Sequence, residues 1–100
     1  MSSGEIDITQ LWTAVAPLAR SRVALLEEYV EALPSEADEA QQRDAACTAA
    51  HQLAGALGTY GRSGSEQAAL LEHLLRAGGA APDVDQVRRL VRELRLAVEA

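Results

Sequence analysis

Residues 50–61 read Ala50-His51-Gln52-Leu53-Ala54-Gly55-Ala56-Leu57-Gly58-Thr59-Tyr60-Gly61, and this stretch decides the fold. At about 3.6 residues per turn, the apolar positions of the region share one side of a helix. They are Ala46, Ala50, Leu53, Leu57 and Tyr60. His51 lies roughly 140° from the middle of that stripe. We therefore expect a helix that buries one face and turns its histidine toward water.

The neighbours of His51 on its own helix face are all small. Cys47 and Thr48 lie one turn before it, Ala54 and Gly55 one turn after it, and Gly58 two turns after it. A glycine inside a helix costs about 1 kcal/mol relative to alanine, so two glycines on this face need a reason. Close approach of another protein surface would supply one.

Composition predicts a single all-α domain over residues 1–100, with residues 1–6 flexible. Of the 100 residues, 48% are hydrophobic, mostly Ala, Leu and Val, and Phe is absent, which favours packed helices over a β-sandwich. The 9 basic residues are all arginines and face 15 acidic residues, for a net charge of −6, which argues against a nucleic-acid partner. With Cys47 as the one cysteine and no membrane span or signal peptide visible, we expect a cytoplasmic, reducing setting.

Helix starts are indicated by a capping pattern, in which Ser or Asp is followed three residues later by Gln, Glu or Asp. The pairs are Asp7 with Gln10, Ser35 with Asp38, Ser63 with Glu66, and Asp83 with Gln86. Predicted ends follow at Pro34, at Gly61 as a left-handed cap, and at Gly78-Gly79. Because short connections join antiparallel neighbours, the helices before and after Gly61 should form a hairpin.

The start of the chain leaves two possibilities, because Pro17 either kinks one long helix or opens a second one at its first turn. We predict an antiparallel four-helix bundle with an additional short N-terminal helix. Leu11, Trp12 and Val15 should point inward, and no apolar stripe is left over once each helix buries one face.

The chemistry of the chain centres on His51, because imidazole near neutral pH keeps a lone pair on one ring nitrogen and can act as a nucleophile. An open imidazole on a rigid helix suits exchange of a phosphoryl group with a partner. It does not suit a self-contained hydrolase, which would need a base or an oxyanion hole as well.

The stretch from Ala50 to Gly61, followed by Ser65 and the Leu71-Glu72 pair, resembles the histidine-containing phosphotransfer (HPt) domain. In that family a His-x-Leu-x-Gly pattern, then an apolar residue and a second glycine, surrounds the phosphorylated histidine. Leu11-Trp12 and Arg22-Val23-Ala24-Leu25-Leu26-Glu27 are similar to the preceding helices of HPt domains that accompany response regulators. The resemblance covers nearly the whole chain.

The resemblance implies that His51 accepts a phosphoryl group from a histidine kinase or a receiver aspartate and passes it to a receiver aspartate. Gly55 and Gly58 would let the receiver dock closely, with Cys47, Thr48, Gln52 and Ala54 around the phosphoryl group. The chain would be a monomeric phosphocarrier, not an enzyme, without a cofactor of its own. Any Mg²⁺ would sit in the partner receiver.

One position departs from the family. Many HPt domains carry a lysine at the first or third position after the histidine, where this chain has Gln52 and Ala54. Arg62 is a candidate for the missing charge, and a solvated loop residue is its plainer interpretation. The departure also leaves room for an HPt-like adaptor or inhibitor that docks on a receiver or kinase without being phosphorylated.

Other candidate features have ordinary interpretations. Cys47 and His51 have the spacing of a metal-binding pair, but no third ligand accompanies them, so we expect no metal site. Glu72 is either a family signature residue that holds the bundle together or a helix-surface charge. The arginines of residues 88–95 could receive an acidic partner or form a solvated face. A bundle that serves only oligomerisation is a third, weaker reading of the whole chain.

Overall fold

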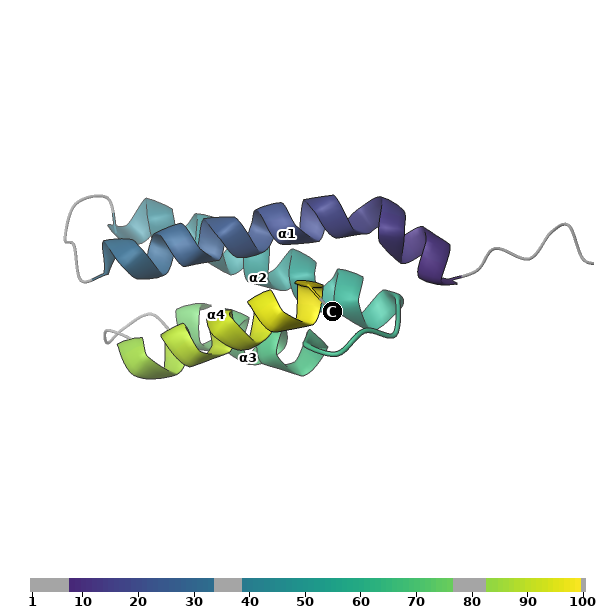
Figure 1. The fold of residues 1–100 in the computed structure, drawn as a ribbon. Helices are drawn as coiled ribbons and strands as arrows, with labels where there is room; N and C mark the ends of the chain where they lie inside the picture. The colour runs from purple at the N-terminus through teal and green to yellow at the C-terminus, as the bar shows by residue number, and fades with distance from the viewer. Residues whose placement is uncertain (1–7, 34–38, 77–82, 100) are drawn as a thin grey trace, which may run out of the picture.

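The computed structural model describes residues 8–33, 39–76 and 83–99, and these ranges form four helices. They are α1 (Ile8–Ala32), α2 (Glu39–Thr59), α3 (Ser65–Arg76) and α4 (Val84–Glu99). Each helix runs antiparallel to the one before it, in up-down-up-down order (Figure 1). The long helices α1 and α2 pack side by side, α3 packs on α2, and α4 lies against α1 and α3. The all-α bundle predicted from the sequence is confirmed.

One core runs through the bundle, built from the apolar stripe of each helix. On α2 the stripe is rich in alanine, and Ala46, Ala50, Leu53 and Leu57 are fully buried. Small side chains on α2 let the neighbouring helices approach closely, while leucines and valines of α1, α3 and α4 fill the remaining space. The largest fully buried side chains are Leu26, Leu53, Leu57, Leu71, Leu75, Leu94, Val23, Val87 and Val98.

The short extra helix predicted at the N-terminus is not a separate element. Its residues form the first turns of α1, which continues through Pro17 without interruption. Pro17 is exposed, while Ala16 and Ala19 beside it are buried. The proline ring therefore points away from the core, and packing of the buried face keeps the helix continuous although Pro17 supplies no N–H group.

The turn between α2 and α3 confirms the predicted left-handed cap. Gly61 has φ 64°, and the amides of Gly61 and Arg62 donate to the carbonyls of Gly58 and Leu57 at 3.2 and 2.8 Å. These two bonds form a Schellman motif, which satisfies carbonyls at the end of α2. The tight turn sets α3 directly beside α2.

The start of α3 lies one residue later than the Ser63 capping pattern predicted. Gly64 has φ 103°, and its carbonyl accepts the first bond of the helix from Ala68 N–H at 2.9 Å. A Cβ at Gly64 would lie 2.9 Å from the Ala97 Cβ, so the close packing of α4 needs glycine here. Ser63 thus precedes the glycine that begins α3.

The start of α4 agrees with its capping pattern. Asp83 Oδ1 accepts hydrogen bonds from the backbone amides of Asp85 at 3.0 Å and Gln86 at 3.3 Å. The remaining boundary predictions, at Asp7, Pro34, Ser35, Asp38, Gly78-Gly79 and the flexible residues 1–6, fall outside the described residues.

Two predictions about α1 need correction. Trp12 is buried as expected, but Leu11 is 39% exposed and Val15 is only half-buried. Leu11, Leu18 and Leu25 repeat every seven residues and all remain partly exposed, so α1 does keep a row of apolar side chains outside the core. Leu25 borders α2, because it lines a small hollow together with Ala45. The core of a small bundle cannot cover the flanks of a 25-residue helix that has two neighbours.

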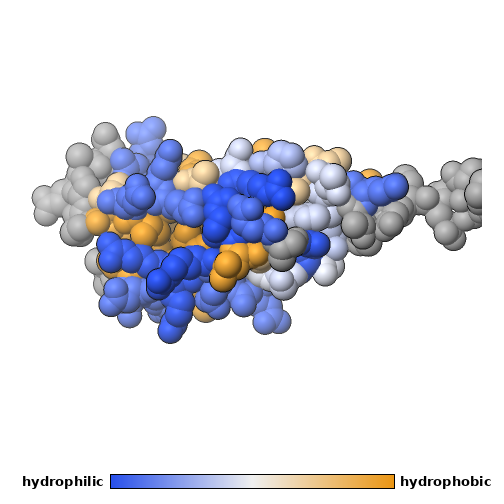
Figure 2. Space-filling model, in the orientation of Figure 1, coloured by the Kyte–Doolittle hydropathy of each residue, from blue (hydrophilic) through white to orange (hydrophobic). Residues whose placement is uncertain are grey.

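The outer surface of α1 and α4 is mainly hydrophilic, with apolar colour between the two helices (Figure 2). Arg95 on α4 joins the helices through Glu27 on α1, with Nε to Oε2 at 3.1 Å and Nη2 to Oε1 at 2.6 Å. It also bonds Glu99 at 3.0 Å. Among the described residues, no helix has the length and apolar character that a membrane crossing would need.

Candidate functional site

His51 lies near the middle of α2, and its side chain is 68% exposed. Ala50 and Leu53 beside it are fully buried, so the backbone that carries His51 is fixed by the core. The prediction that this histidine faces water is confirmed. The helix thus presents an accessible imidazole from a rigid support.

Glu72 on α3 contacts the His51 ring directly. Its carboxylate oxygens lie 3.0 and 3.2 Å from Nδ1 of His51, and its side chain is only 14% exposed. Nη2 of Arg76, one turn further along α3, donates to Glu72 Oε2 at 2.5 Å. Glu72 is therefore more than a surface charge, because its carboxylate joins α3 to the exposed histidine of α2.

This contact fixes the tautomer of the imidazole. A carboxylate can only accept a hydrogen bond, so Nδ1 of His51 must carry the proton that it donates to Glu72. In the neutral ring the lone pair then resides on Nε2. The nitrogen that could react is the one that Glu72 does not hold.

Three of the predicted site residues line the contact between α2 and α3. Cys47 is half-buried, and its Sγ lies 3.8 Å from the backbone carbonyl of Glu72. Ser65 Oγ donates to the Ala54 carbonyl at 3.0 Å. A Cβ placed on Gly58 would lie 3.2 Å from Ser65 Oγ. Packing within the chain therefore accounts for Gly58, because it makes room for the first residue of α3.

Gly55, in contrast, has no internal explanation. A Cβ added there would meet nothing within 4 Å. Thr48, Gln52 and Gly55 are exposed on the same helix as His51. These four residues form the open face of α2, and the missing side chain at Gly55 leaves this face unobstructed there.

Arg62 lies away from this face. Its guanidinium carbon is 4.7 Å from the centre of the Trp12 ring, and Trp12 in turn packs against Tyr60 with ring centroids 6.2 Å apart. α2 extends eight residues beyond His51 before it ends at Thr59, about 12 Å of helix rise. Arg62 thus covers one end of the bundle, whereas the arginine linked to His51 through Glu72 is Arg76.

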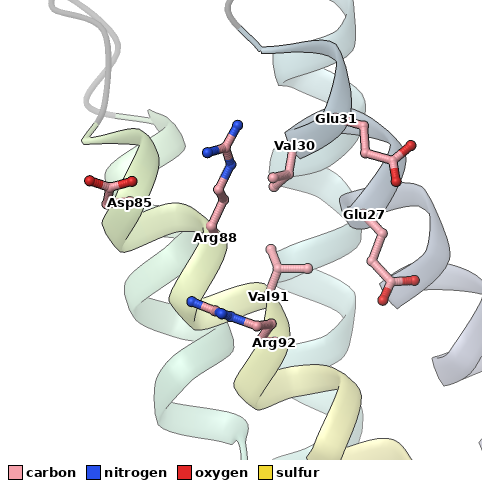
Figure 3. A pocket seen from close by; sticks show the side chains of 7 residues that line it. All are labelled: Glu27, Val30, Glu31, Asp85, Arg88, Val91 and Arg92. Carbon is pink, nitrogen blue, oxygen red and sulfur yellow. The ribbon is translucent and has the colours of Figure 1, made fainter.

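Within the described ranges, no three His, Cys, Asp or Glu side chains gather as ligands would. Another groove lies between α1 and α4, where Glu27 and Glu31 on α1 and Arg88 and Arg92 on α4 line it on either side of Val30 and Val91 (Figure 3). No histidine lines that groove.

Comparison with known proteins agrees with this geometry. The family model of the Hpt domain matches residues 12–100, which includes α2, α3, α4 and all of α1 after its first four residues. No curated protein and no solved structure gives a significant match to the chain. Hpt domains act in histidine phosphotransfer within phosphorelays and interact with response regulators or kinases. An exposed histidine in the second helix of a four-helix bundle, together with a family match over this span, shows that the chain belongs to the Hpt domain family.

Proposed function

We propose that this chain carries a phosphoryl group in a His-Asp phosphorelay, and that His51 is the residue on which the group travels. The observation that carries the proposal is the pair of His51 and Glu72, in which an imidazole that is 68% exposed has Nδ1 held 3.0 Å from a carboxylate. Nε2 is left as the nucleophile, and it is directed away from the contact with α3.

The proposed transfer step balances without a further reactant. The Nε2 lone pair forms a bond to phosphorus, and the bond between phosphorus and the aspartyl oxygen of the donor breaks, leaving a carboxylate. The ring gains a positive charge, because Nδ1 keeps its proton while Nε2 is substituted. The Glu72 carboxylate beside Nδ1–H stabilises that charge, and it stabilises the uncharged starting ring less.

The donor and the acceptor are expected to be a kinase or receiver domain on one side and a receiver domain on the other, acting on a monomer of this chain in the cytoplasm. The open face of α2 supports close docking, since Gly55 leaves space that nothing in the described chain fills. Any Mg²⁺ required would be held by the receiver. The role of this chain is that of a carrier, and the catalysis belongs to the partner.

Labelling tests the assignment of the site. A phosphorylated receiver, or its kinase with ATP, should place an acid-labile, alkali-stable phosphate on the wild-type chain. His51→Gln should abolish the label. His73→Gln is the matched control, because His73 is the second of the 2 histidines, is exposed on α3, and should be dispensable. Labelling that persists in His51→Gln would disprove the site.

The same experiment separates the carrier from an adaptor or inhibitor that docks on a receiver without being phosphorylated. Ala54 stands where many family members carry a cation, which is the specific observation in favour of the adaptor. Tight binding of a receiver with no phosphohistidine under labelling conditions would establish that alternative.

A further inference from the structure

A hollow of about 640 Å³ opens beside His51, between α2 and the C-terminal half of α3. Arg43 and Asp44 line it from α2, and Leu75 and Arg76 line it from α3. His51 forms part of its wall. An exposed nucleophile and two guanidinium groups thus border one cavity.

The register of the hairpin explains why the arginines meet there. α2 and α3 are antiparallel, so the residues that precede His51 on α2 lie beside those that follow Glu72 on α3. Arg43 comes two turns before His51, and Arg76 one turn after Glu72. Both are therefore on the side of His51 that faces away from the α2–α3 turn, whereas Arg62 lies beyond that turn.

The two arginines differ in how they are held. Arg76 is 69% exposed and bonds Glu72 through Nη2. The other N–H groups of its guanidinium are not used in this ion pair. Arg43 is half-buried and makes no ion pair with the part of the chain that the structure describes. Asp44 is the opposing charge at the rim, and Glu72 is already engaged by His51 and Arg76.

We infer that Arg43 and Arg76 bind the phosphoryl oxygens of phosphorylated His51, and so supply the positive charge that position 54 does not provide. This inference rests on the proposed function of His51. Guanidinium groups suit the task because their planar N–H donors match phosphoryl oxygens and stay charged at every relevant pH. Arg76 would turn from Glu72 toward the phosphoryl group without moving α3.

Phosphoramidate tests the inference without an identified partner. In its zwitterionic form it offers a P–N bond: His51 Nε2 attacks phosphorus, that bond breaks, and ammonia leaves. The rate of phosphohistidine formation and its hydrolysis lifetime are followed by ³¹P NMR. We expect Arg43→Ala and Arg76→Ala each to slow labelling or shorten the lifetime about tenfold, with Arg76→Lys intermediate.

Arg88→Ala and Arg92→Ala are the matched controls. They remove the same charge from the α1–α4 groove, a hollow of about 690 Å³ that arginines and carboxylates also line but no histidine does (Figure 3). Labelling should stay at the wild-type level in both. Circular dichroism melts should show that all four alanine variants remain folded.

Salt dependence separates direct binding of the phosphoryl group from a structural effect. Added salt screens exposed charges, so it should shorten the phosphohistidine lifetime of the wild type more than that of the Arg43→Ala, Arg76→Ala double variant.

Wild-type rates and lifetimes in both single variants would overturn the inference and leave the proposed function intact, provided His51→Gln does not label. A wild-type chain that phosphoramidate and a phosphorylated receiver both fail to label would overturn the two together.

Discussion

The state of a single imidazole ring determines what His51 can do. Glu72 holds Nδ1 at 3.0 Å, which favours the tautomer with its proton on Nδ1 and its lone pair on Nε2. A free imidazole samples both tautomers. The hydrogen bond therefore orients the ring and leaves Nε2 as the nitrogen available for the proposed transfer.

Replacing Glu72 by alanine should remove the preference of His51 for the tautomer with its proton on Nδ1. We expect the ring ¹⁵N shifts of neutral His51, measured by NMR, to move from those of a dominant Nδ1–H tautomer toward the ordinary mixture. Phosphohistidine formation should slow by about tenfold or more, because a charged hydrogen-bond partner is lost. His73 supplies an internal control in the same spectra, since it is exposed and bonds to neither Glu72 nor Arg76 in the described chain. Unchanged His51 shifts would refute this role of Glu72.

The role of Glu72 was accessible from the sequence, although helix periodicity alone could not supply it. A hairpin centred on Gly61 and Arg62 places residues at equal distances from the turn opposite one another, so that Gly58 meets Ser65 and His51 meets Glu72. The exposure of His51 was predictable, because it depends only on the phase of one helix. Its partner depends on the register between two helices.

The packing of α2 gives its two glycines different roles. Gly58 is required within the chain, since a Cβ there would crowd Ser65 Oγ at 3.2 Å, whereas Gly55 touches nothing within 4 Å. Both had been interpreted from the sequence as docking residues. Internal packing now explains Gly58, so the proposed docking role is needed only to explain Gly55. A neighbouring helix was required to reveal the packing reason.

Gly55→Ala should stabilise the folded chain by about 0.5–1 kcal/mol, because alanine loses less backbone entropy in a helix. Urea unfolding measures this gain. The added methyl group should slow transfer from a phosphorylated receiver about tenfold by crowding the interface, yet leave labelling by phosphoramidate unchanged.

Gly58→Ala is the comparison on the same helix, and the contact with Ser65 should cancel its gain in stability. A Gly55→Ala chain that receives phosphate from the receiver at the wild-type rate would show that the receiver does not cover this part of α2.

Helix boundaries were predictable where local backbone chemistry sets them. Gly61 and Asp83 act as the caps that their residue types suggested. Pro17 and Gly64 depend on more distant parts of the chain: buried neighbours keep α1 continuous through the proline, and the approach of α4 requires a glycine before α3. A local sequence pattern predicts neither the packing around Pro17 nor the approach of α4 to Gly64.

At the scale of the whole molecule, the functional hairpin and the remaining helices have separate tasks. α2 and α3 supply His51, Glu72 and the arginine hollow, while α1 and α4 close the core behind them (Figure 1). The exposed leucines of α1 remain outside this core, and Leu25 among them lines a hollow next to α2. The pattern of a single helix could not show that these leucines lie beyond the reach of the core.

The link between α1 and α4 makes stability depend on pH in a defined direction. Hydrogen bonds from Arg95 lower the pKa of Glu27 below its usual value of 4.5. Burial opposes this shift in part, and the positive charge of Arg95 adds to it. The unfolded chain therefore binds a proton at this site more readily than the folded chain does. The stabilisation from the Glu27–Arg95 ion pair is therefore complete when the pH is above the pKa of Glu27 in the unfolded chain. It is lost as the pH falls through the lowered pKa of Glu27 in the folded chain.

Glu27→Gln should lower the free energy of unfolding at pH 7 by about 0.5–1 kcal/mol, a modest loss because both partners are partly exposed to solvent. In urea titrations at successively lower pH, the difference from the wild type should shrink and then disappear once Glu27 is protonated in the folded chain. Glu28→Gln makes the same change in charge at an exposed neighbour on α1. Its free energy of unfolding should not show a deficit at pH 7 that disappears in acid. A Glu27→Gln deficit that persists undiminished in acid would mean that shape rather than charge joins α1 to α4.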